Sequence, residues 1–146
     1  MWKKIKHNRL HVILFFLILF GFNLYEGSNL DIIDNYVKKP LKGSNSTAAY
    51  FKVVNKSQNK VLLREIRCKG VSKTSFHKME IDSETELMKM TSLKSIELMP
   101  NSIRKFSPMK EHIMMMGLEK GFDEKSTVIC SLYANGNEIT WSFPLK

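Results

Sequence analysis

Apolar and polar residues alternate in short runs along most of this chain, and this alternation restricts the fold more than any other feature. Side chains of a β-strand point to opposite faces in turn, so a two-residue period marks a strand with one buried face. No long segment has the 3.6-residue apolar period of a helix, and turn-forming stretches separate many of the runs. The sequence therefore predicts an all-β sandwich or barrel. The expected strands are residues 31–37, 48–54, 60–69, 75–80, 86–91, 102–106, 111–116, 127–133 and 138–143.

The first 26 residues differ from the rest of the chain. Four basic residues precede an apolar run at residues 12–20, which is the order found in a secretory signal. The run is shorter than the ~20 apolar residues of a membrane span, and no A-x-A cleavage site follows it. We therefore expect an exported protein in which residues 1–26 are a signal peptide or an uncleaved membrane anchor. No cysteine lies just after the run, so a lipid anchor is not expected, and residues 27–146 should form one domain.

The charge of the chain limits the classes of partner. The formal net charge is +9, and the first 26 residues contribute four basic residues and one acidic residue. The remainder thus has 19 basic against 13 acidic residues, a charge of +6. A basic exported domain suits an acidic protein partner or anionic lipid, and nucleic acid is not expected in that compartment. The lysines are dispersed, however, which favours an ordinary solvated surface.

The chain has two cysteines, Cys68 and Cys130, each within an alternating apolar run. In an oxidising compartment they can form a disulfide that bridges two strands. They can equally be two small buried hydrophobic residues. They lack C-x-x-C spacing, so thiol redox chemistry has little support.

Histidine and methionine are unevenly distributed. Beyond the N-terminal segment the only histidines are His77 and His112, and every methionine except the first lies between positions 79 and 116. Imidazole and thioether ligands suit a soft monovalent metal such as Cu(I) better than zinc, calcium or magnesium. The sequence therefore predicts a copper site formed by His77, Met90, His112 and Met114.

Strand geometry supports part of this ligand set. His112 and Met114 would point to the same face with Cα atoms ~6.5 Å apart, so both can reach one ion. Met115 would turn to the other face and belong to the core. Met88 and Met90 would also share one face of their strand.

Other interpretations of these residues remain open. A half-buried histidine beside core methionines is common in proteins without metal. A methionine-rich patch can also be an adaptable surface for a partner or a sacrificial target of oxidation. Neither of these last two interpretations explains the histidines.

These residues resemble the metal motif of the periplasmic PCu(A)C-type copper chaperones. That motif is a His often followed by Met, ten residues, Met, twenty-one residues and His-x-Met. Met90, His112 and Met114 fit its second part. The resemblance covers roughly residues 31–144, and further matching segments are Tyr36–Pro40, Ala48–Asn55, Leu87–Met90 and His112–Leu118.

The first part of the motif differs. Lys78 follows His77, and the interval from His77 to Met90 is one residue longer than in the family. Met79 and Met88 are therefore further candidate ligands. A glycine usual in the turn after the His-x-Met segment is also absent at residues 123–126.

The resemblance implies a cupredoxin-like Greek-key β-sandwich that binds one Cu(I) ion at its edge. It implies a monomeric periplasmic chaperone that delivers copper towards the Cu(A) site of cytochrome c oxidase, together with Sco-type proteins. No Ser-His-Asp set or phosphate-binding glycine-rich loop is visible, so we do not expect an enzyme. A periplasmic copper buffer or resistance protein and a β-sandwich interaction module without metal are the alternatives.

Overall fold

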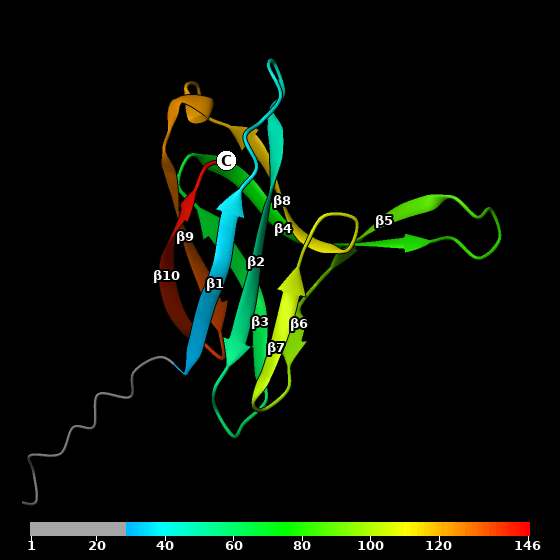
Figure 1. Ribbon diagram of the computed structural model, residues 1–146, viewed down its shortest axis with the longest axis vertical. Coiled ribbons are helices and arrows are strands. Elements are labelled where there is room, and N and C mark those ends of the chain that lie inside the picture. The colour runs from blue at the N-terminus through cyan, green and yellow to red at the C-terminus, as the bar shows by residue number, and fades with distance from the viewer. Residues whose placement is uncertain (1–28) are drawn as a thin grey trace, which may run out of the picture.

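The computed structural model describes residues 29–146, which form two β-sheets packed face to face (Figure 1). The predicted signal or anchor, residues 1–26, lies outside the described residues. The first sheet contains β1 (Leu30–Val37), β2 (Ser46–Asn55), β4 (Val71–Ile81), β5 (Met88–Leu93), β7 (Ser102–Phe106) and β8 (Glu111–Leu118). The second contains β3 (Val61–Cys68), β6 (Ile96–Leu98), β9 (Thr127–Ala134) and β10 (Asn137–Pro144).

Strands distant in sequence are neighbours in both sheets. The first sheet runs in the order β1-β2-β8-β4-β5, and β7 pairs with the part of β2 that β8 leaves free. The second runs in the order β10-β9-β3-β6. The predicted two-sheet, all-β sandwich is confirmed.

All nine predicted strands occur, with ends displaced by a few residues. The pattern missed β6, which has only three residues, and a short 3₁₀ turn, η1 (Phe122–Glu124). The largest displacement is at the start of β4, which begins four residues earlier than predicted. These added residues, Val71–Thr74, alternate poorly in sequence, but they pair with the end of β8, Met115–Leu118. Pairing with a neighbouring strand thus extends β4 beyond the residues whose apolar and polar alternation predicted it.

The core lies between the two sheets and is rich in phenylalanine. Phe51 of β2 stacks on Phe106 of β7 with ring centroids 4.4 Å apart, and it meets Phe143 of β10 edge-on at 5.7 Å. All three rings are at most 2% exposed. The contact between Phe51 and Phe143 joins the two sheets through apolar burial and aromatic packing.

The two cysteines form a disulfide. Cys68 of β3 and Cys130 of β9 are directly paired neighbours in the second sheet, with Cα atoms 4.1 Å apart. Both are buried. Of the two interpretations that the sequence left open, the structure selects the strand-bridging disulfide.

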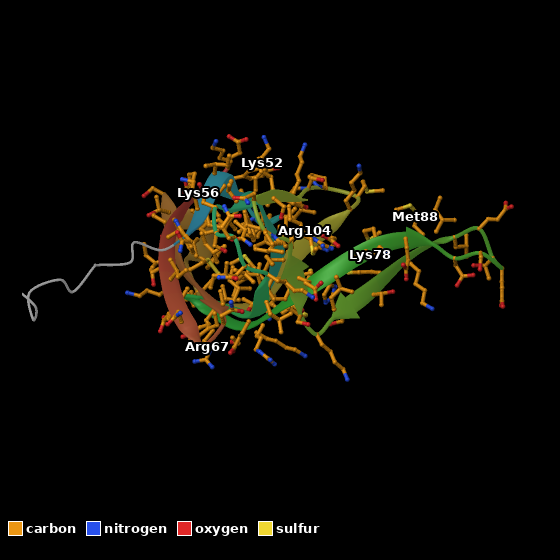
Figure 2. All side chains as sticks on the ribbon, turned by 90° about the horizontal axis from the view of Figure 1, so that it is seen from below. Lys52, Lys56, Arg67, Lys78, Met88 and Arg104 are labelled. Atoms are coloured by element: carbon orange, nitrogen blue, oxygen red, sulfur yellow. A yellow bond between two sulfur atoms is a disulfide. The ribbon has the colours of Figure 1, made fainter. Side chains whose placement is uncertain are left out.

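The ends of β4 and β5 form a hairpin that extends away from the sandwich (Figure 1). In Figure 2 this hairpin, with Met88 on it, extends beyond the densely packed side chains of the sandwich. β5 pairs only with β4 and is therefore an edge strand. Ile81, Leu87, Met88 and Met90 are all exposed on this hairpin.

Candidate metal site

The pairing of β4 with β8 brings the two histidines together. His77 lies directly opposite His112, and their ring centroids are 5.8 Å apart at an interplanar angle of 59°. Directly opposite residues in an antiparallel pair point to the same face of the sheet. Phe76 and Ile113, one position away from these histidines, are both buried in the core. The two imidazoles therefore lie on the outer face of the first sheet.

Neighbouring groups fix the orientation of His112. Its Nδ1 lies 3.0 Å from the carbonyl oxygen of Lys110, and that carbonyl also accepts the backbone N–H of Met79. A carbonyl oxygen can only accept, so Nδ1 carries the hydrogen and the neutral ring keeps its lone pair on Nε2. The Tyr50 ring packs against His112 with centroids 6.4 Å apart. Only 6% of His112 is exposed, so this histidine is held by its surroundings.

His77 has a different environment. Its Nε2 lies 2.9 Å from the Ser75 hydroxyl, and its Nδ1 is buried without a hydrogen-bond partner. Burial lowers the pKa of His77, and the nearby His112 and Lys73 lower it further. The lowered pKa favours the neutral imidazole, which is the form that binds metals.

Strand register places methionines on both sides of His77. Met114 of β8 lies opposite Ser75, two positions from His77 along β4. Met79 lies two positions from His77 in the other direction, and Met90 of β5 lies directly opposite Met79. Residues two apart on a strand share a face, so all these side chains occupy the same face as the imidazoles. Diagonal neighbours are ~7–8 Å apart between Cα atoms, within reach of long side chains.

The predicted site residues are thus neighbours on one face, with His77 at the centre. His112 is directly opposite His77, whereas Met114 and Met90 are its diagonal neighbours on β8 and β5. Met88 pairs with Ile81, two positions farther towards the hairpin turn, so it is more distant than Met90. Met79 adjoins His77 on β4 itself and stays a candidate ligand.

The methionines differ in burial in the way that the strand pattern predicted. Met115 is completely buried, which confirms its assignment to the core. Met114 is half-buried, and 47% of Met90 is exposed. The thioether on β5 is therefore the more accessible of these two.

The chemistry of this donor set is soft and neutral. Within residues 29–146, no three His, Cys, Asp or Glu side chains are grouped so that they could hold a metal ion. Glu111 directly precedes His112, but Arg104 binds both of its carboxylate oxygens, with an Nε–Oε2 distance of 2.7 Å. The donors that face one another are imidazoles and thioethers, which suit Cu(I).

The sequence pattern missed three groups around the histidines. These are the Ser75 hydroxyl, the Lys110 carbonyl and the Tyr50 ring. Ser75 precedes His77 by two positions on β4, so strand periodicity could have placed its hydroxyl on the same face, whereas the Lys110 carbonyl belongs to the turn before β8 and has no such signal. Tyr50 could not be found in this way, because its contact depends on how β2 pairs with β8.

Comparison with known proteins identifies the family. A family model described as "Putative lipoprotein LpqE-like" matches residues 30–145. The chain belongs to this family. No curated protein matches the LpqE-like chain.

Solved structures of PCuAC domains share the fold of this LpqE-like chain. The copper-bound PCuAC domain from PmoF2 matches with a TM-score of 0.67 at 18% identity, covering 84% of this chain and 96% of that one. The apo PCuAC domain from PmoF1 has a TM-score of 0.67 at 12% identity, with coverages of 84% and 97%. The solution structure of CuI-DR1885 from Deinococcus radiodurans has a TM-score of 0.57 at 21% identity, with coverages of 77% and 74%. The predicted PCu(A)C-type family and cupredoxin-like sandwich are confirmed.

None of the helical structure within residues 29–146 has the length and apolar character that crossing a membrane requires.

Proposed function

We propose that this protein is an exported chaperone that binds one Cu(I) ion through His77, Met90, His112 and Met114. The observation that carries the proposal is the strand register, which sets two neutral imidazoles 5.8 Å apart with thioethers on either side. Two of the similar structures, the PCuAC domain from PmoF2 and CuI-DR1885, hold copper, the second as Cu(I), and they support the same cargo. The proposed role is carriage of copper and not catalysis.

The first test is a competition titration. The full-length chain should bind one Cu(I) in competition with a Cu(I) chelator, and it should bind Zn(II) much more weakly, because thioethers are poor ligands for zinc. The control is a matched pair of exposed methionines. Met90→Ala should weaken Cu(I) binding, whereas Met99→Ala should not. Met99 follows β6, and its carbonyl accepts a hydrogen bond from Asn55 at the far end of β2. Tighter binding of zinc than of copper would contradict the soft-site assignment.

We further propose that the copper passes to the Cu(A)-bearing subunit of cytochrome c oxidase or to a Sco-type protein. Neutral ligands, of which the Met90 thioether is exposed, allow stepwise exchange, because a thiolate of the acceptor can bind the ion before the last thioether leaves. Release should therefore require contact between the two proteins.

Transfer kinetics distinguish a chaperone from a copper buffer. The rate of copper transfer should rise with acceptor concentration and exceed the rate to a small chelator of equal affinity. Added salt should slow transfer if the basic surface guides docking to an acidic partner. A transfer rate that equals simple dissociation and ignores the acceptor concentration would instead favour the buffer.

A further inference from the structure

The two imidazoles at the candidate site present different nitrogen atoms. We infer that His112 binds Cu(I) through Nε2 and His77 through Nδ1, and that Ser75 is the positioning residue that holds the His77 ring in this orientation. The inference rests on the proposed copper function and adds the ligand atoms and a supporting residue to it.

The assignment for His112 follows from its second nitrogen. Nδ1 donates its hydrogen to the Lys110 carbonyl at 3.0 Å, so it has no lone pair to offer a metal. Histidine ligands commonly donate their other ring N–H to a carbonyl or carboxylate, which fixes the tautomer and the ring orientation. Nε2 is therefore the donor atom of His112.

The assignment for His77 is the reverse. Its Nε2 is engaged by the Ser75 hydroxyl at 2.9 Å, whereas its Nδ1 is buried and has no partner. A hydrogen on Nδ1 would be a buried donor without an acceptor, which is unfavourable. A hydrogen on Nε2 is instead donated to Ser75 Oγ. The neutral ring thus keeps its lone pair on Nδ1, and a soft cation would satisfy this unpaired atom.

The position of Ser75 makes this arrangement specific. Ser75 lies on the same face as His77 and directly opposite Met114, so its hydroxyl is next to the proposed ligands. Two metal–nitrogen bonds of about 2 Å each can fit between rings whose centroids are 5.8 Å apart. Each imidazole would then bind the metal through one nitrogen and make a hydrogen bond through the other. His112 bonds to the Lys110 carbonyl, and His77 bonds to the Ser75 hydroxyl.

Imidazole nitrogen NMR on the full-length chain tests the assignment directly. On addition of Cu(I), the ¹⁵N signals of His112 Nε2 and His77 Nδ1 should shift as metal-bound nitrogens, while the other two nitrogens should stay protonated. Chelator competition on the same sample reports copper binding itself. Bound copper with ligation through His77 Nε2 would overturn the inference and leave the proposed function intact, whereas absence of copper binding would overturn both.

Substitution of Ser75 tests its positioning role. Ser75→Ala should weaken Cu(I) binding by about 10–100-fold, the usual effect of losing such an outer hydrogen bond. It should also let the free His77 ring populate both tautomers in the ¹⁵N spectrum. Ser75→Thr, which keeps a hydroxyl, should retain the wild-type affinity and tautomer.

Ser131→Ala is the matched control. Ser131 also lies on a strand and makes one side-chain hydrogen bond, with Thr140 in the second sheet. This substitution should leave copper affinity unchanged. An unaltered His77 tautomer and unaltered affinity in folded Ser75→Ala protein would overturn the role of Ser75.

Discussion

Met115→Ala should destabilise the protein by about 2–5 kcal/mol, the range for truncating a buried methionine, and leave the Cu(I) affinity of the folded protein unchanged. Met115 is completely buried on the core face of β8. Met114→Ala should do the opposite. It removes a thioether from the outer face, so Cu(I) affinity should fall at least about tenfold, or ~1.4 kcal/mol, with a small change in stability.

Denaturant unfolding and chelator competition on both variants measure these effects. The two residues are adjacent and of one type, so each variant is the control for the other. Loss of copper binding in Met115→Ala with none in Met114→Ala would show that the face assignment of β8 is wrong by one residue. Met114 separates binding from folding better than His112, because His112 is buried and packs against Tyr50.

Removing the disulfide should give the second large effect. Cys68 and Cys130 are 62 residues apart, and closing a loop of that length stabilises a protein by about 4 kcal/mol in the chain-entropy model. The double variant Cys68→Ala/Cys130→Ala should therefore lose about 2–4 kcal/mol, which corresponds to a fall in Tm of roughly 8–16 °C for a domain of this size.

Thermal unfolding followed by circular dichroism measures this loss. Wild-type protein treated with a reductant should melt like the double variant, and the reductant should not change the melting of the double variant itself. The bridge lies in the second sheet, whereas the candidate ligands lie on the outer face of the first. Folded double variant should therefore keep its Cu(I) affinity, and a loss of binding would contradict this separation.

Local patterns predicted the strands well, because a half-buried strand must alternate its side chains. They failed where pairing decides the outcome. β6 has three residues, Ile96–Leu98, too few to establish a period, and it exists because it pairs with β3. The disulfide likewise required the register that sets Cys68 beside Cys130.

The sequence alone names the residues of the candidate site but not their arrangement. The shared face of His112 and Met114 follows from a period of two within one strand. The position of His77 opposite His112 follows only from the pairing of β4 with β8. The chain between His77 and Met90 forms the β4–β5 hairpin, in which Met90 pairs with Met79 and Met88 lies farther out. The choice between these methionines therefore needed the three-dimensional register.

The protruding β4–β5 hairpin divides the candidate donors into a rigid and a compliant group. His112 lies on β8, which is paired on both sides and packed against the core, whereas Met90 lies on an edge strand that is bonded to β4 alone. Segments with few buried contacts open at a lower free energy than strands in the core. The thioether of Met90 can therefore swing away while both imidazoles stay in place. An ion held in this way would have one labile bond facing solvent, and that bond would define the side from which another molecule approaches it.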